Sequence, residues 1–320
     1  MVTKQLWDQM FPERWGVGEE WKKEYQSLEI YYPQMMVDYY SYDNFKNAIL
    51  RMSGLRCSLF ANEAGATEQD RSREVAAFLA TISYRTAKNG RALYYREEIF
   101  HERSTAGNVE LYRNPKYKNY ALGNKPTCFP QGSPKAGRVR FTTQSYHGRG
   151  PMQLTGDDNY GAFSEVVFQT PDTLLCDPNM LLVDGELAFM SAIWYWLRSV
   201  RPYGSAHQAM YKDLYNHETW GFGHTIVILS GGTARGGVEG GPTEVDRAVT
   251  EQIAWYRKYA EALGVTVGVN GEQLDTKGMF ELITLLSTVH SLRGNITKFQ
   301  KLSSFVMKNE SHEDRNATDR

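Results

Sequence analysis

The stretch RSREVAAFLATISYRTA, residues 71–87, carries the strongest helix signal in the chain. Its apolar residues recur at intervals of three and four, at Val75, Phe78, Leu79 and Ile82. This spacing places them on one face of an α-helix. Arg85 follows Ile82 by three positions and continues the same face. We therefore predict an amphipathic helix whose inward face ends in a cation.

Helical patterns also dominate the segments on both sides of this helix. Further helices are predicted at residues 6–11, 41–49, 186–198, 245–263 and 279–292. The 186–198 segment is apolar on nearly all sides, which is typical of a central buried helix. Gly90 is expected to end the 71–87 helix, and the polar residues 62–71 are expected to form a loop. Strand signals are few and short, so the predicted fold is mainly α.

Glycine and proline mark the irregular parts of the chain. Residues 103–140 hold four glycines and four prolines, which predicts a long loop of the kind that often serves function. Residues 230–241 read SGGTARGGVEGG, but no Gly-Lys-Ser/Thr follows them. That segment is therefore a flexible loop rather than a phosphate cradle. The fold should carry a cleft built by loops.

Composition excludes several classes of function. The 320 residues are 41% hydrophobic, and 36 basic side chains face 37 acidic ones. A net charge this close to zero gives no general attraction to nucleic acid or anionic lipid. No apolar run approaches the roughly 18 residues that span a bilayer. The first 15 residues include Asp8 and Glu13 and lack an apolar core, so we expect no signal peptide and either a cytosolic chain or a mature form without its leader.

The cysteines point to neither a disulfide scaffold nor a metal site. Cys57, Cys128 and Cys176 lie far apart and allow at most one internal disulfide. They lack the spacing of zinc ligands. We expect no metal and no cofactor.

Residues 146–161 read YHGRGPMQLTGDDNYG, which resembles the most recognisable motif of the family 19 chitinases. Other segments resemble the family in the same order, at residues 6–14, 39–49, 73–83, 187–197, 221–232 and 253–265. The resemblance implies a domain over residues 1–267, followed by a C-terminal helical extension and polar tail over 268–320. It also implies a lysozyme-like fold of two lobes with a deep cleft for polymers of N-acetylglucosamine, in a family that is usually secreted.

The resemblance implies an inverting hydrolysis. One carboxylic acid protonates the leaving oxygen, while a second carboxylate activates a water on the opposite face of the sugar. Matched position by position, Glu97 or Glu98 takes the role of the base, and Thr155 holds the water. The residues matched to substrate binding are Tyr146, Gln153, Asn159 and Ser230.

The first carboxylate is missing at its expected place. The family helix ends in Ser-His-Glu-Thr, whereas residues 83–86 here read Ser-Tyr-Arg-Thr, which places Arg85 at the general-acid position. Arginine stays protonated at neutral pH and cannot act as the acid. Because an unpaired inward cation is costly, we expect Arg85 to form an ion pair with Glu97 or Glu98.

These departures favour a chitinase-like protein that binds chitin or a related polymer with impaired hydrolysis. Asp158, Ser230 and Gln252 also differ from the residues usual in the family. Two alternatives stay open. One is an active glycosidase of chitin or a peptidoglycan-like polymer with a rearranged acid, for which Glu102 is the out-of-order candidate. The other is a structural subunit, with the 279–292 helix as a possible contact for a protein partner.

Overall fold

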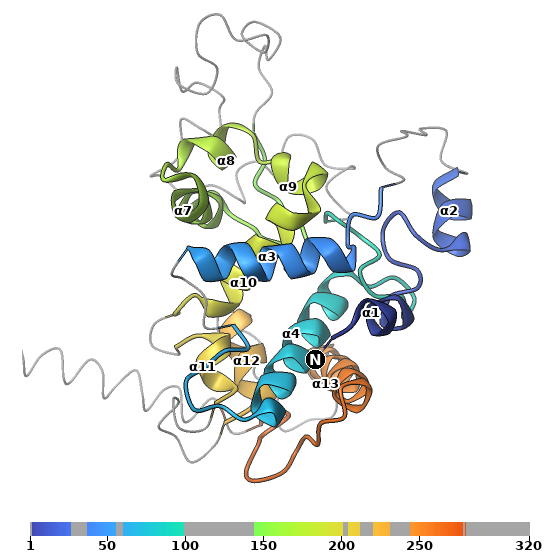
Figure 1. Ribbon diagram of the computed structural model, residues 1–320, viewed down its shortest axis with the longest axis vertical. Helices are drawn as coiled ribbons and strands as arrows, with labels where there is room; N and C mark the ends of the chain where they lie inside the picture. Colours follow the sequence, from blue (N-terminus) through green and yellow to red (C-terminus); the bar gives the residue numbers. More distant parts are fainter. Residues whose placement is uncertain are drawn as a thin grey trace, which may run out of the picture.

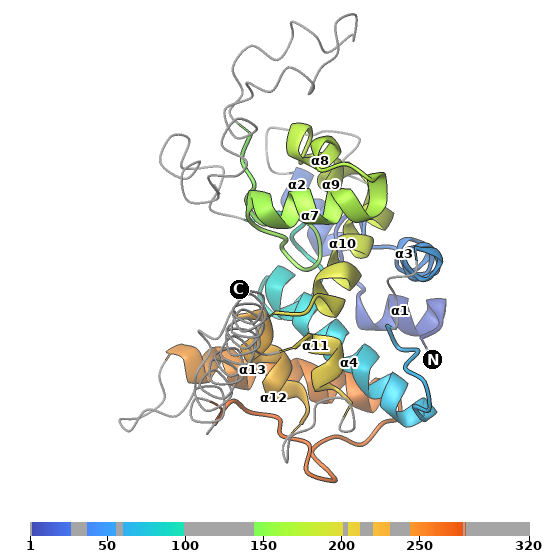
Figure 2. The ribbon, with the colours of Figure 1, turned by 90° about the vertical axis from the view of Figure 1, so that its left-hand side faces the viewer.

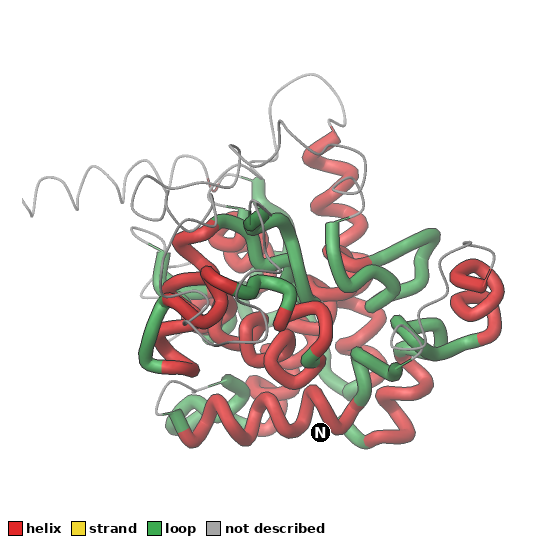
Figure 3. Tube along the Cα trace, turned by 90° about the horizontal axis from the view of Figure 1, so that it is seen from above, coloured by secondary structure: helices red, strands yellow, loops and turns green. Residues whose placement is uncertain are grey.

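A computed structural model describes residues 2–26, 37–55, 60–98, 144–200, 204–211, 220–230, 244–277 and 279. Its helices are α1 (Lys4–Met10), α2 (Glu19–Gln26), α3 (Tyr42–Gly54), α4 (Glu68–Thr86), α7 (Asp157–Phe168), α8 (Asp172–Cys176), α9 (Met180–Val183), α10 (Gly185–Leu197), α11 (Ala206–Ala209), α12 (Phe222–Leu229) and α13 (Glu244–Ala262). Within these residues, extended pairing is limited to isolated bridges (Figure 3). The prediction of a mainly α fold is confirmed.

The helices gather in two groups joined by a central pair. Helices α7, α8 and α9 form the upper group, and α4, α11, α12 and α13 form the lower one (Figures 1 and 2). Helices α3 and α10 pack against each other between them, while α4 packs along α13. The lower group therefore carries α4 and presents its C-terminal end toward the upper one.

Helix α4 begins and ends at places that the sequence alone did not predict. Thr67 caps its N-terminus in a capping box with Asp70, so the helix starts inside the segment expected to be a loop. It ends at Thr86 rather than at Gly90. The Thr86 hydroxyl donates to Ile82 O at 2.6 Å and accepts from Leu93 N at 3.0 Å, so the returning chain fixes the helix end.

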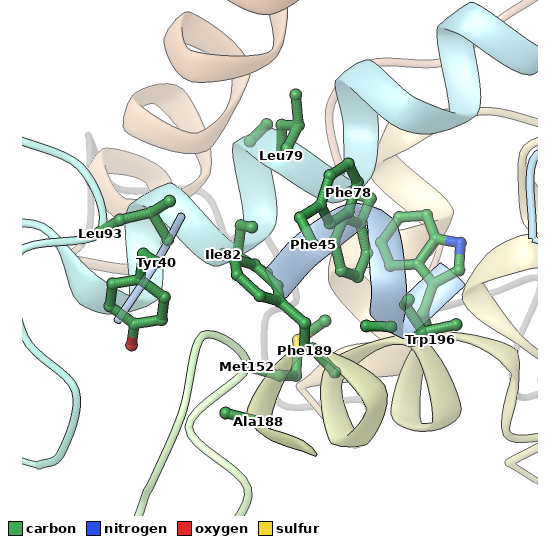
Figure 4. Close-up of a cluster of buried hydrophobic side chains, with 14 of the residues drawn as sticks. Tyr40, Phe45, Phe78, Leu79, Ile82, Leu93, Met152, Ala188, Phe189 and Trp196 are labelled. Atoms are coloured by element: carbon green, nitrogen blue, oxygen red, sulfur yellow. The ribbon is translucent and has the colours of Figure 1, made fainter. Parts of the chain in front are cut away.

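The inward face of α4 is buried as its spacing predicts. Phe78, Leu79 and Ile82 are fully buried (Figure 4). The Phe78 ring lies 5.6 Å from the ring of Trp196 of α10. Burying a side chain of this size stabilises a fold by about 1.5–3 kcal/mol. This packing fixes the rotation of α4 and so the direction in which Arg85 leaves it.

A buried polar cluster braces the lower group. Glu74 of α4 is fully buried, and its carboxylate accepts hydrogen bonds from Ala61 N, Trp196 Nε1, His207 Nδ1 and Tyr211 Oη at 2.7–2.8 Å. His207 Nε2 also lies 3.1 Å from Glu63 Oε2. Burial alone would lower the pKa of His207, but the two carboxylates raise it above its usual value. His207 thus joins α11 to α4 and to the segment before it.

Several predicted features lie outside the described residues. They are the 103–140 loop, Glu102, the segment after Ser230 in the glycine-rich stretch, and the 279–292 helix apart from Met279. Among the described helices, none is both long and apolar enough to cross a membrane. Cys176 takes part in a disulfide bond.

Candidate functional site

The segment 146–161 forms a tight turn that leads into α7. Gly150 has a φ of +74°, and a Cβ there would lie 3.3 Å from the Cβ of Ala188, so the turn requires glycine. Gln153 adopts a φ of +53° although it has a side chain. Its amide Nε2 donates to Gly150 O at 2.9 Å, which holds this conformation. Such strained residues tend to cluster at functional sites.

The segment carrying the two adjacent glutamates pairs with this turn. An isolated antiparallel bridge joins Glu97 to Arg149. Glu98 N donates to Gly148 O at 2.9 Å, and Gly150 N donates to Arg96 O at 2.8 Å. The structure therefore brings the candidate base segment directly against the Gly-Arg-Gly-Pro turn.

Glu97 and Glu98 have different surroundings. Glu97 Oε2 lies 3.2 Å from His147 Nε2, whereas the Glu98 carboxylate accepts from Gly148 N at 3.2 Å. Burial would raise the pKa of Glu97, but His147, Arg149 and Arg96 hold it below its usual range. Glu97 is therefore an ionised carboxylate, which is the state that a general base needs.

Arg85 makes no ion pair with Glu97 or Glu98, so that expectation is wrong. The two terminal nitrogens of Arg85 donate instead to backbone carbonyls, to Met152 O at 3.1 Å and to Leu229 O at 3.0 Å. Leu229 ends α12, and carbonyls in the last turn of a helix have no partner within the helix. A cation is also favoured at this negative end of the helix dipole. These carbonyls satisfy the Arg85 guanidinium in place of a carboxylate.

Arg85 thereby joins three of the predicted site segments. Met152 precedes Gln153 in the turn, and Leu229 precedes Ser230 at the end of α12. Figure 4 draws Met152 next to Phe189 of α10, which anchors the turn in the core. The end of α4, the turn and the end of α12 therefore meet at the Arg85 guanidinium.

The remaining polar candidates are close in sequence to the two residues that Arg85 contacts. Thr155 Oγ1 is 3.5 Å from Gln153 O, and Asn159 Nδ2 donates to Thr155 O at 2.6 Å. All three side chains are partly buried. Ser230 is the C-cap of α12, and its hydroxyl donates to Val227 O at 3.0 Å.

Tyr146, which the resemblance matched to substrate binding, is instead a core residue. Its side chain is 1% exposed, and its hydroxyl donates to Leu175 O at 2.7 Å. The ring lies 5.4 Å from that of Tyr160 and has no face open to a ligand. The aromatic residue of the motif packs the turn against the upper group of helices.

Two residues at the site were not among the predicted ones. His147 contacts Glu97, and Arg198 donates a hydrogen bond to Asn159 Oδ1. His147 stands inside the motif, so its position was a usable signal. Arg198 directly follows α10, and nothing in its sequence spacing pointed to α7. Across the described part of the chain, no group of three or more His, Cys, Asp or Glu residues could hold a metal ion.

The helical fold in two groups is of the lysozyme-like class. The sequence profile described as chitinase class I, of glycoside hydrolase family 19, matches residues 34–275. Chitinase 10 of Oryza sativa subsp. japonica is 31% identical over 253 residues, which cover 72% of this chain and 71% of that protein. The chain belongs to glycoside hydrolase family 19.

Solved structures share this fold. Chitinase C of Streptomyces griseus HUT6037 superposes with a TM-score of 0.53 at 23% identity, covering 86% of this chain and 96% of that one. A bacterial family 19 chitinase gives a TM-score of 0.52 at 25% identity and covers 85% of this chain and 99% of that one. The acidic endochitinase WIN6 of Populus trichocarpa is 28% identical over 207 residues. The match covers 62% of this chain and about half (53%) of that protein.

Proposed function

We propose that this protein binds polymers of N-acetylglucosamine in the family cleft and hydrolyses them weakly or not at all. The observation that carries the proposal is the state of Arg85. Its guanidinium, at the position matched to the general acid, is held by the carbonyls of Met152 and Leu229. A guanidinium keeps its protons at neutral pH and cannot deliver one to a leaving oxygen.

The water side of the site supports binding with little turnover. Glu97 is ionised beside His147, and Thr155 lies in the adjacent turn. We assign Glu97 rather than Glu98 to the base position, because the Glu98 carboxylate accepts a backbone hydrogen bond from Gly148. General-acid catalysis contributes about two to four orders of magnitude. Without it, a site of this kind retains its ligand contacts and loses most of its rate.

Gln153 and Asn159 are the proposed sugar contacts. Both side chains are partly buried amides on one segment, where they can exchange hydrogen bonds with the acetamido and hydroxyl groups of a sugar. Losing one partner of such a bond costs about 1–3 kcal/mol. Gln153→Ala should therefore weaken binding by about tenfold.

Calorimetry with a chitin hexasaccharide tests the proposal, with chromatography of the same sample after prolonged incubation. The expected result is saturable heat from the wild type and no shorter oligosaccharides. Gln69→Ala is the matched control, because Gln69 is exposed on α4 away from the turn and should leave the affinity unchanged. Rapid appearance of products would favour an active glycosidase. Absence of binding at millimolar ligand would favour a structural subunit.

A further inference from the structure

Within the described part of the chain, Arg85 uses only part of its hydrogen-bonding capacity. An arginine side chain carries five N–H donors, and those of Arg85 that have a partner reach Met152 O and Leu229 O. Among the described residues, no carboxylate oxygen lies within 4.0 Å of it. The Arg85 side chain as a whole is partly buried. Arg85 is therefore a fixed cation that pairs with no carboxylate of the described residues.

Arg198 is a second cation with the same property. It is exposed, and it donates to Asn159 Oδ1. Its guanidinium lies 5.6 Å from the ring centroid of Trp194 and 5.9 Å from that of Tyr195. Within the described chain it too has no carboxylate oxygen within 4.0 Å. Stacking on the two rings holds the guanidinium in place without neutralising it.

The two arginines border the same part of the site. Arg85 contacts Met152 and Arg198 contacts Asn159, which are the two sides of the segment carrying Gln153 and Thr155. Both arginines therefore contact the proposed sugar-binding segment.

The acidic side chains of the described site have partners of their own, Glu98 with Gly148 N among them. Glu97 contacts His147 and feels the charges of Arg149 and Arg96. Asp157 and Asp158 lie in the first turn of α7, where the positive end of the helix dipole favours a carboxylate. Among the residues that the structure describes, neither Arg85 nor Arg198 is paired with a carboxylate.

We propose that this site prefers an acidic saccharide, in which N-acetylated amino sugars alternate with sugars that carry a carboxylate. Arg85 and Arg198 receive that carboxylate. The planar fork of arginine matches a carboxylate with two parallel hydrogen bonds, which a neutral hydroxyl cannot reproduce. The inference rests on the proposed function, since it names the class of polymer that the same cleft holds. It also gives Arg85 a role in ligand binding, which the loss of the general acid alone does not explain.

The test compares two hexasaccharides by calorimetry at about 20 mM and about 300 mM salt. Electrostatic attraction reaches further at the lower salt concentration and is strongly screened at the higher one. One is a hyaluronan hexasaccharide, which alternates N-acetylglucosamine with glucuronic acid. The other is the chitin hexasaccharide, which is neutral. The variants are Arg85→Gln and Arg198→Gln. Arg51→Gln is the matched control, because Arg51 pairs with Glu186 on an exposed face and its loss changes the net charge equally.

At low salt the wild type should bind the acidic hexamer about tenfold more tightly than the neutral one. Each site variant should reduce that ratio several-fold, high salt should reduce it for the wild type, and Arg51→Gln should keep it. Equal affinities in the wild type, or a ratio that survives both site variants, would overturn the inference while binding of the chitin hexamer still upheld the proposed function. If neither hexamer binds, both proposals fail.

Discussion

Replacing Arg85 by methionine should destabilise the fold as well as alter the site. Methionine keeps most of the apolar stem of the side chain and removes the guanidinium. The variant therefore loses the two hydrogen bonds that join α4 to Met152 O and Leu229 O. Its effect on stability isolates these two bonds from the packing of the stem.

The expected loss follows from these two bonds. A hydrogen bond from a charged donor contributes about 1.5–3 kcal/mol. Arg85 is half-buried, so water can reach the freed carbonyls and recover part of that energy. We expect a loss of about 2–3 kcal/mol in the free energy of unfolding. In a domain of this size each kcal/mol lowers Tm by about 2–4 °C, so Tm should fall by about 5–10 °C.

Urea denaturation and thermal melting of the wild type and Arg85→Met measure this loss. Arg51→Met is the matched control, because the exposed Arg51–Glu186 pair should contribute less than about 1 kcal/mol. Arg85→Lys should fall between the wild type and Arg85→Met, since one ammonium group cannot span both carbonyls in the same way. If Arg85→Met is as stable as the control, then Arg85 does not join α4 to these segments.

Three further outcomes are expected. The carboxylate partners of His207 raise its pKa. Its contribution to stability should therefore be full below about pH 6.5 and decline as the pH rises through the raised pKa. Urea titrations at several pH values should show this decline for the wild type and not for His207→Gln. Gly148→Ala would place a Cβ 2.9 Å from Gln153 Oε1, so calorimetry should show weaker binding of the chitin hexamer, and unchanged affinity would exclude Gln153 as a contact. A 2,4-dinitrophenyl chitotrioside needs no proton on its leaving group, so wild type should release dinitrophenol faster than Glu97→Gln by about two orders of magnitude, and equal rates would remove Glu97 as the base.

Local periodicity was sufficient to predict where Arg85 would lie but not what it would bind. The spacing of Val75, Phe78 and Ile82 fixed the buried face of α4, and Arg85 leaves the helix on that face as predicted. Its partners are carbonyls at Met152 and Leu229. Their positions depend on how the turn and α12 pack, and a sequence pattern contains no such information.

The turn itself shows the same limit. The motif singled out its glycines and Gln153, and the bridge between Glu97 and Arg149 brings the two segments together. An irregular turn has no period that separates its buried side from its open side. The burial of Tyr146 was therefore missed, although its hydroxyl bond to Leu175 O is local to the upper group of helices.

The central claim is that the place of the general acid is held by a cation. It is tested most directly by comparing the wild type with Arg85→Glu on the chitin hexasaccharide, with Arg85→Gln as the control that has no acid. A glutamate there would face the carbonyls of Met152 and Leu229, which raise a carboxyl pKa and keep the proton that an acid must donate.

Product formation followed by chromatography, with the anomer identified by NMR, gives the answer. We expect no detectable cleavage by wild type or Arg85→Gln. Arg85→Glu should cleave with inversion at the anomeric carbon, at a rate at least about a hundredfold higher. Wild type that cleaves the hexamer as fast as Arg85→Glu would contradict the claim, because another group would then be supplying the proton.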